Sequence, residues 1–180
     1  MKQLYFVRHG QSQLNEDGKW AGTTDTPLTP KGHEQAKQTG QGVKAEGLAF
    51  DAIVSSPLQR AHHTAQHIAR QIGYPEDAII IEPRLIERSF GTLENTRDLV
   101  ARAKYVINER AIESYPEVES LDDLHVRAAE VLEYLQTLPY DKILVVGHGA
   151  SGRALRRVIN KEPLDYVGER YDNAQLVRLI

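Results

Sequence analysis

Lys2-Gln3-Leu4-Tyr5-Phe6-Val7-Arg8-His9-Gly10 is a short apolar and aromatic run that ends in a charged pair and a glycine. A run of this kind predicts a β-strand. Far downstream, Ile143-Leu144-Val145-Val146-Gly147-His148-Gly149 repeats the arrangement. In open α/β sheets, ligands bind at the carboxyl edge of the strands. Because both strands end in His-Gly, we expect His9 and His148 to lie side by side at a functional site.

The chain between and around these two strands alternates between strand and helix patterns. Thr29 is expected to cap a helix that starts at Pro30, and Ser56-Pro57 is expected to start a second helix in the same way. Apolar residues at helical spacing predict helices over residues 58–72, 121–135 and 150–159, and β-favouring runs predict strands over residues 49–54, 78–81 and 174–180. This alternation predicts a three-layer α/β/α sandwich with a mostly parallel central sheet.

Two segments fall outside this alternation. Residues 11–27 are rich in Gly, Asn, Asp and Thr, which predicts a long functional loop. Residues 95–119 are strongly charged and less periodic, and we expect them to form a helical cap inserted over the site. We find no internal repeat or linker, so residues 1–180 are expected to form a single domain.

The composition narrows the possible functions. A net charge of −3 gives no electrostatic reason to expect a nucleic-acid or membrane partner. The chain has no cysteine, which excludes disulfides, thiolate metal sites and cysteine nucleophiles. No apolar run approaches the roughly 18 residues of a membrane span, and the N-terminus lacks a secretory signal pattern. We therefore expect a cytoplasmic protein.

Several short motifs accompany the two His-Gly strands. They are Arg8-His9-Gly10-Gln11-Ser12 with Asn15, the stretch from Trp20 to Thr29, Ser55-Ser56-Pro57-Leu58-Gln59-Arg60-Ala61, Glu87 before Phe90-Gly91, and Gly147-His148-Gly149 before Arg153. In this order and spacing, the chain resembles the histidine phosphatase superfamily, the phosphoglycerate mutase-like proteins, in the branch with the Arg-His-Gly motif. The resemblance runs from Phe6 to Asn173, nearly the whole chain.

The resemblance implies a set of site residues. In the family, the residues matching Arg8, His9, Arg60 and His148 form a phosphate pocket, and the residue matching His9 is phosphorylated. Neutral imidazole can act as such a nucleophile, and nearby arginines disfavour its protonation. Arginine forks match phosphate oxygens, and the N-terminus of the helix after Gly149 is expected to present free N–H groups to an anion. The family also implies that Glu87 is the proton donor, and that Asn15 and Thr23 touch phosphate or substrate.

Three alternatives concern individual residues. Glu94 is the nearest rival to Glu87 as the acid. His62, His63 and His67 include an i, i+4 pair that could bind zinc, but no further ligand is indicated, so we expect a solvent-facing helix surface and no metal. His33 shows no sign of a partner. Residues 147–152 satisfy the G-x-G-x-x-G pattern, but no acid ends the strand that follows, so we reject dinucleotide binding and expect no cofactor.

These features together predict a metal-independent phosphomonoester hydrolase, similar to histidine acid phosphatases, that acts on a small-molecule phosphomonoester. One alternative is phosphoglycerate mutase-type transfer. Classical mutases of the family carry an Arg-Arg pair and a Pro-Pro pair in the insertion, and residues 95–119 contain neither. The other alternative is a non-catalytic phosphate- or phosphoprotein-binding module, which would need neither the nucleophile His9 nor the acid Glu87. Neither the substrate nor the oligomeric state follows from the sequence.

Overall fold

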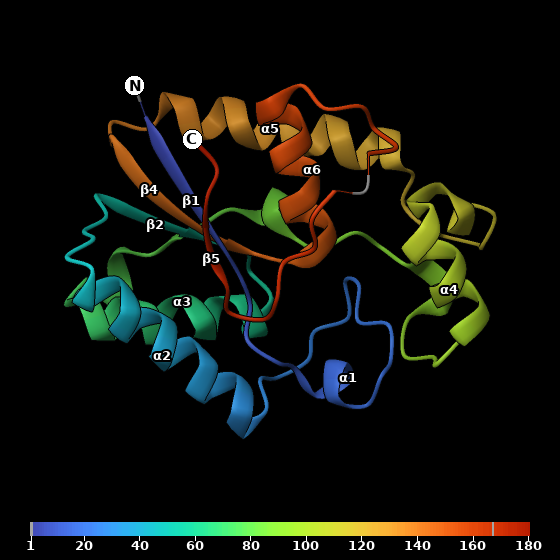
Figure 1. Ribbon diagram of the computed structural model, residues 1–180, viewed down its shortest axis with the longest axis horizontal. Coiled ribbons are helices and arrows are strands. Elements are labelled where there is room, and N and C mark those ends of the chain that lie inside the picture. The colour runs from blue at the N-terminus through green and yellow to red at the C-terminus, as the bar shows by residue number, and fades with distance from the viewer. Residues whose placement is uncertain (1, 167) are drawn as a thin grey trace.

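In the computed structural model, which describes residues 2–166 and 168–180, five strands form one sheet in the order β3-β2-β4-β1-β5. The strands are β1 (Gln3–Arg8), β2 (Ala52–Ser55), β3 (Ile80–Ile81), β4 (Lys142–Gly147) and β5 (Leu176–Arg178). β1, β4, β2 and β3 pair in parallel, and β5 pairs antiparallel with β1. The predicted mostly parallel α/β sheet is confirmed. Arg8 pairs with Gly147, so His9 and His148 follow at the same edge of the sheet (Figure 1).

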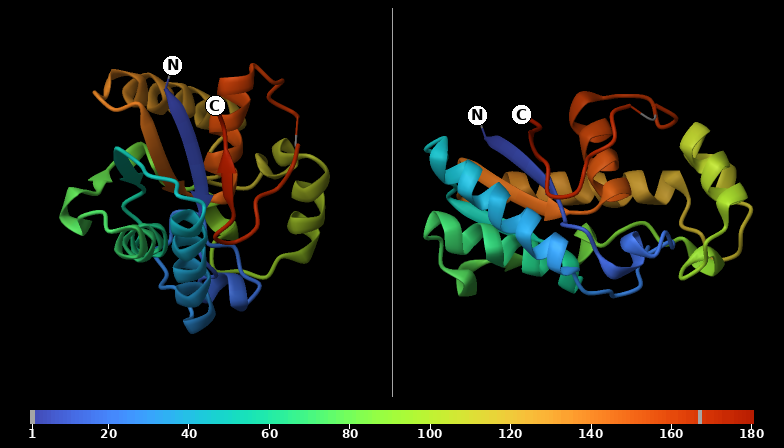
Figure 2. Two further views of the ribbon diagram at one scale, coloured as in Figure 1. Left: turned by 60° about the vertical axis from the view of Figure 1, so that its left-hand side comes forward. Right: turned by 60° about the horizontal axis from the view of Figure 1, so that its bottom comes forward.

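Two helices cover each face of the sheet. α2 (Pro30–Ala45) and α3 (Gln59–Ile72) lie on one face, and α5 (Leu121–Thr137) and α6 (Gly149–Asn160) lie on the other (Figures 1 and 2). Because side chains alternate along a strand, β1 directs Tyr5 and Val7 into the core beside α2 and α3. It directs Leu4 and Phe6 into the core beside α5 and α6. This is the expected three-layer arrangement.

The starts of α2 and α3 differ. Thr29 caps α2 as predicted, because its hydroxyl accepts the N–H of Gly32 at 3.1 Å. α3 begins only at Gln59, and the preceding Leu58 offers no side-chain cap. The prediction that Ser56 caps this helix is therefore wrong. The Ser56 hydroxyl lies 2.8 Å from Nε2 of His148, so it belongs to the carboxyl edge of the sheet.

The outer strands are shorter than predicted. Of residues 78–81 only Ile80–Ile81 pair with the sheet, because residues Glu76–Ala78 form a 3₁₀ turn (η1) after Pro75. Of residues 174–180, only Leu176–Arg178 form β5. No helix in the described part of the chain is both long and apolar enough to cross a membrane.

The segment predicted as a cap contains α4 (Leu99–Ile107) and a 3₁₀ turn, η4 (Glu109–Ile112). Two further 3₁₀ turns precede it, η2 (Pro83–Leu85) and η3 (Gly91–Leu93). Tyr105 and Ile112 of the cap pack with Trp20 and Phe90 in a small core of their own. The predicted loop over residues 11–27 contains a one-turn helix, α1 (Gln13–Glu16), and lies to the left of α4 in Figure 1. Residues of this segment and of this loop both line the cavity beyond the ends of β1 and β4.

Candidate active site

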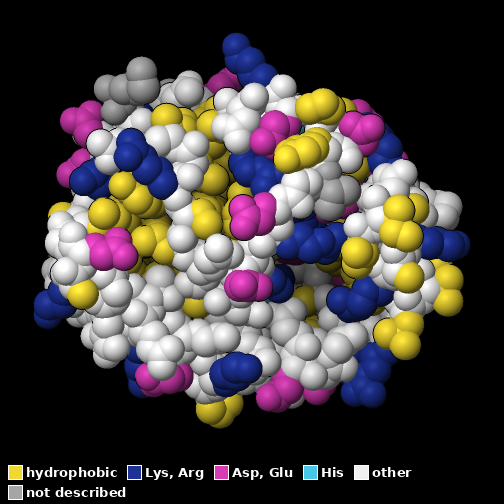
Figure 3. Space-filling model, viewed as in Figure 1, with side chains coloured by type: hydrophobic (Ala, Val, Ile, Leu, Met, Phe, Trp, Pro, Cys, Tyr) yellow, Lys and Arg dark blue, Asp and Glu magenta, His cyan; other side chains and the backbone are white. Residues whose placement is uncertain are grey.

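A cavity of about 210 Å³ opens at the carboxyl edge of β1 and β4. Figure 3 shows Lys and Arg side chains gathered around this hollow beside α4. Of the residues predicted for the site, the cavity is lined by Arg8, His9, Asn15, Arg60, Glu87 and Gly149. Two predicted residues do not line it, His148 and Thr23.

His9 is buried, with 3% of its surface exposed. Its Nδ1 lies 2.6 Å from the carbonyl oxygen of Gly10. A carbonyl can only accept a hydrogen bond, so Nδ1 carries the proton and Nε2 keeps its lone pair. Burial lowers the pKa of His9 well below its usual value, and the charges of Arg60 and Arg8 lower it further. His9 is therefore neutral at physiological pH, with Nε2 able to act as a nucleophile.

His148 lies behind His9, at a ring centroid distance of 5.2 Å. Its Nε2 contacts the hydroxyl of Ser56 at 2.8 Å, while its buried Nδ1 has no hydrogen-bond partner among the described residues. Burial and the charge of Arg60 lower the pKa of His148 well below its usual value. Ser56 thus orients the ring, and Nδ1 keeps its capacity for one hydrogen bond. Sequence reasoning missed this role of Ser56, although the residue lies within the Ser55–Ala61 motif.

Arg8 and Arg60 each keep one buried donor unused. Nη1 of Arg8 donates to the carbonyl of Tyr171 at 2.8 Å, and Arg60 donates to the carbonyls of Gly22 and Thr24 at 2.7 and 2.8 Å. The Nε atoms of both arginines are buried and have no hydrogen-bond partner among the described residues. Burial lowers the pKa of Arg60 to about 10, which leaves it charged at neutral pH. A buried donor without a partner is costly, and both arginines line the cavity.

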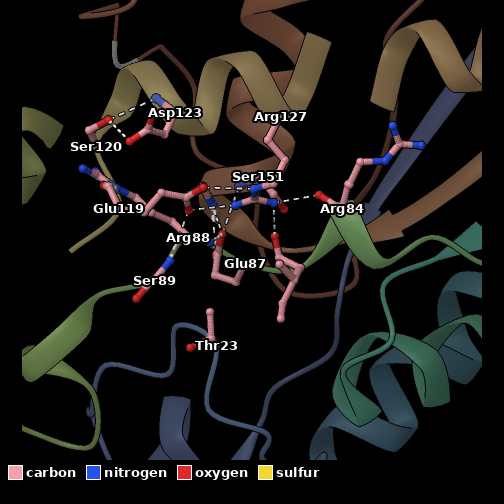
Figure 4. Close-up of polar contacts among 12 residues, drawn as sticks. Thr23, Arg84, Glu87, Arg88, Ser89, Glu119, Ser120, Asp123, Arg127 and Ser151 are labelled. Atoms are coloured by element: carbon pink, nitrogen blue, oxygen red, sulfur yellow. Dashed lines mark hydrogen bonds and ion pairs between the residues drawn. The ribbon is translucent and has the colours of Figure 1, made fainter. Parts of the chain in front are cut away.

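Glu87 is also buried and accepts three backbone N–H groups, from Arg88 at 2.9 Å, Ala150 at 3.0 Å and Ser151 at 2.9 Å (Figure 4). Two of these donors belong to the N-terminus of α6, which the sequence predicted to be free for an anion. That prediction is wrong for Ala150 and Ser151, because their backbone N–H groups already donate to the Glu87 carboxylate. Oε1 accepts from all three donors and Oε2 from one, so Oε2 is the oxygen with capacity left for a proton.

Arg127 of α5 holds the segment that carries Glu87. Its Nη1 donates to the carbonyls of Arg84 and Ile86, at 2.7 Å each. Its Nε and Nη2 donate to the carboxylate of Glu119 at 2.9 and 2.8 Å (Figure 4). Sequence reasoning missed Arg127, because an arginine on the polar side of an amphipathic helix looks like a surface charge.

Glu94, which follows η3, binds Thr23 and Thr24 in the loop that follows α1. The Glu94 carboxylate accepts the N–H groups of Thr23, Thr24 and Phe90 at 2.9, 2.9 and 3.0 Å. A Cβ atom at Gly22, where φ is +51°, would lie only 2.0 Å from Oε1 of Glu94. The structure therefore uses Glu94 to shape the loop. Thr23 directs its hydroxyl to Glu94 and stays outside the lining of the cavity.

The predicted histidine pair on α3 has a partner on α2. Nδ1 of His33 lies 2.7 Å from Nε2 of His67, so the expectation that His33 has no partner is wrong. Burial and the neighbouring His33 lower the pKa of His67 to about 4. Within residues 2–166 and 168–180, no group of three or more His, Cys, Asp or Glu side chains could hold a metal ion.

Residues 4–180 match the profile of the histidine phosphatase superfamily, branch 1. The chain belongs to this superfamily. Among its curated relatives is the 2,3-bisphosphoglycerate-dependent phosphoglycerate mutase of Brucella canis, which is 40% identical over 163 residues. That match covers 84% of this chain and 78% of the mutase.

Solved structures of other proteins show the same fold. A mutant phosphoserine phosphatase from Entamoeba histolytica, solved with phosphoserine, has a TM-score of 0.78 at 28% identity and covers 99% of this chain and 90% of its own. The same enzyme was solved with 3-phosphoglyceric acid, at a TM-score of 0.77 and 27% identity, with the same coverage. A mycobacterial hydrolase reaches a TM-score of 0.84 at 23% identity, covering 99% of this chain and 88% of its own, which supports the fold alone.

Proposed function

We propose that this protein hydrolyses small phosphomonoesters through a phosphohistidine formed on His9. The observation that carries this proposal is the hydrogen bond between Nδ1 of His9 and the carbonyl of Gly10, which leaves Nε2 unprotonated in a cavity lined by Arg8 and Arg60. In the first step, the Nε2 lone pair forms a P–N bond while the P–O bond of the ester breaks. The electron pair goes to the leaving oxygen, which takes a proton from Glu87.

The second step returns the enzyme to its starting state. Glu87, now a carboxylate, takes a proton from a water molecule, and the water oxygen forms a new bond to phosphorus. The P–N bond breaks, its electrons return to the imidazole of His9, and inorganic phosphate leaves. The unused Nε donors of Arg8 and Arg60, together with His148, would stabilise the charge on the phosphoryl oxygens in both steps. In this proposal neither step uses a metal ion or a cofactor.

A second candidate is a mutase, in which another hydroxyl of a phosphorylated substrate takes the phosphoryl group in place of water. The 40% identity to 2,3-bisphosphoglycerate-dependent phosphoglycerate mutases supports this candidate. Hydrolysis is supported by the phosphoserine phosphatase likeness and by the cap, because residues 95–119 contain neither an Arg-Arg nor a Pro-Pro pair. Both candidates share the first step and differ in the acceptor of the second.

The deciding experiment follows two products from 3-phosphoglycerate, with and without 2,3-bisphosphoglycerate. A hydrolase releases inorganic phosphate without the bisphosphate. A mutase forms 2-phosphoglycerate when the bisphosphate is present and releases little phosphate, and a binding module does neither. His9→Ala should abolish both reactions while the far-UV circular dichroism spectrum stays the same. Substantial turnover by this variant would refute the phosphohistidine mechanism.

A further inference from the structure

The cavity carries more positive charge than one phosphate group requires. The cavity is lined by six Lys and Arg side chains and by one acidic side chain, Glu87. The whole protein, in contrast, has a net charge of −3. Arg8 and Arg60 account for the reacting phosphate. The other four basic residues that line the cavity are Lys19, Arg102, Arg153 and Arg170. Lysine and arginine gathered in one cavity raise the local concentration of anions.

Arg153 is the most constrained of these four residues, with 4% of its surface exposed. Its Nε donates to Glu109 and its Nη2 to the hydroxyl of Tyr105, both at 2.7 Å. Its Nη1 makes no hydrogen bond to the residues that the structure describes. The guanidinium is therefore held on two sides by the cap and keeps one nitrogen unused.

The unused nitrogen lies beside the reacting groups. A Cβ atom at Gly149 would lie 3.5 Å from Nη1 of Arg153, 3.7 Å from Nε of Arg8 and 3.7 Å from Oε2 of Glu87. Nη1 of Arg153 therefore lies close to Arg8, the arginine expected to bind the phosphate. The same point lies next to Glu87, which is expected to protonate the leaving group. Arg153 therefore adjoins both the arginine expected to bind the phosphate and the residue expected to protonate the leaving group.

We propose that Arg153 is a specificity-determining residue that binds a second anionic group on the substrate, attached to the leaving alcohol. Glu109 is its positioning residue. Glu109 is 2% exposed and binds Arg153 through Oε1 and Arg157 through Oε2, the latter at 2.7 Å. Arg102 and Arg170, nearer the surface, would attract the same group. This proposal rests on the proposed function and narrows its substrate class to phosphomonoesters with a second negative charge.

The test compares two substrates that differ in one group. 3-Phosphoglycerate and glycerol 3-phosphate share a three-carbon skeleton, but the first has a carboxylate where the second has a hydroxymethyl group. The readout is the ratio of their kcat/KM values for phosphate release. We expect the wild-type protein to prefer 3-phosphoglycerate at least tenfold. Arg153→Met and Arg153→Lys should lower that ratio by about 10- to 100-fold, as expected for losing one charged hydrogen bond.

Two further variants separate recognition from folding. Arg156→Lys is the matched control, because Arg156 lies on the same helix α6 but pairs with Glu162 at 3.2 Å and does not line the cavity. It should leave the ratio unchanged. Glu109→Gln keeps Arg153 in the chain but weakens its support, so it should lower the ratio by several-fold. A wild-type protein without a preference for 3-phosphoglycerate would overturn the proposal, and so would an equal loss on both substrates in the Arg153 variants.

Binding measurements keep this proposal independent of turnover. In the His9→Ala variant, calorimetry should show tighter binding of 3-phosphoglycerate than of glycerol 3-phosphate, and adding Arg153→Met should remove the difference. If the proposed function fails, neither substrate releases phosphate, yet this binding preference still holds. If only the second-anion proposal fails, phosphate is released but the binding preference is missing.

Discussion

The imidazoles of His9 and His148 lie 5.2 Å apart, centroid to centroid, with their planes inclined by 59°. They follow adjacent parallel strands whose register pairs Arg8 with Gly147, so the sheet itself brings them together. The pKa values of both histidines are lowered well below the usual value by burial and by Arg60. The positive charge of the resting site therefore comes from arginines. The ring of His148 is oriented by its hydrogen bond to Ser56.

Ser56→Ala should reduce phosphomonoester turnover by about tenfold, because it leaves Nε2 of His148 buried without a partner. The measurement is kcat/KM with p-nitrophenyl phosphate. Ser55→Ala is the matched control, because the adjacent Ser55 is also buried but donates to the carbonyl of Ser56 at 2.9 Å instead of to His148. Equal rates in the two variants would show that Ser56 does not orient His148.

Arg60→Lys should lower the rate on the order of 10²-fold. Lysine keeps the charge but loses the planar fork, and with it the bonds that Arg60 makes to the carbonyls of Gly22 and Thr24. Arg8→Lys is expected to lose a similar factor. Arg70→Lys serves as the control, since Arg70 lies on the same helix α3, is exposed and pairs with Glu76. A near-normal rate for Arg60→Lys would place Arg60 outside the reaction.

Glu87→Gln and Glu94→Gln should differ in how their effects depend on the leaving group. Glu87→Gln removes the proton that a poor alkoxide leaving group needs, so hydrolysis of an alkyl phosphate should slow far more than release of p-nitrophenol. Glu94→Gln weakens the loop that contains Thr23 and Thr24, so it should lower the melting temperature and slow both substrates alike. Burst kinetics on both substrates make the comparison. The reverse pattern would make Glu94 the acid.

The protein should lose stability as the pH falls below about 6.5. Burial lowers the pKa of His9 and His148 well below the usual value, and lowers the pKa of His67 to about 4. In the unfolded chain a histidine titrates near pH 6.5. Below that pH the unfolded chain binds more protons than the folded chain, so the free energy of unfolding is highest above pH 6.5 and declines toward pH 4. Urea unfolding between pH 7.5 and 4.5 measures this decline, and it should be shallower in His67→Gln. An identical decline in that variant would contradict the shift assigned to His67.

Exhaustive chelation should leave the activity unchanged. In the proposed mechanism, Arg8, Arg60 and His148 take the place that a metal ion would have in stabilising the phosphoryl charge. The assay compares phosphate release before and after dialysis against EDTA, with a metal-dependent phosphatase treated in parallel to show that chelation was complete. A loss of activity that a divalent ion restores would refute this prediction.

Much of the site could be predicted because its residues follow strands. A strand that ends in His9 and another that ends in His148 must deliver them to one edge, if the strands are parallel neighbours. Glu87 was expected near the edge, but its bonds to the N-terminus of α6 could not be, since they join segments far apart in the chain. The role of Arg127 is hidden for the same reason. Helix spacing shows which face of α5 is apolar, but not that Arg127 reaches the carbonyl of Ile86.

Edge strands were harder to predict than central ones. Residues 78–81 have the composition of a strand, but only Ile80–Ile81 pair with β2, because Glu76–Ala78 form a 3₁₀ turn. Central strands are buried on both faces, so they are apolar along their whole length and easy to recognise in the sequence. In an outer strand, some of the residues with strand-like composition form turns instead. The same reason explains why β5 spans only three of the seven residues expected.

The shortness of β3 and β5 also bears on how the protein behaves in a crowded solution. A long, flat outer strand presents a row of unpaired peptide groups on which another chain can add a strand, and this is a common start of aggregation. Here the sheet ends in two paired residues on one side and three on the other. The apolar strands β1 and β2 are therefore bordered by outer strands that are too short to recruit a neighbouring chain.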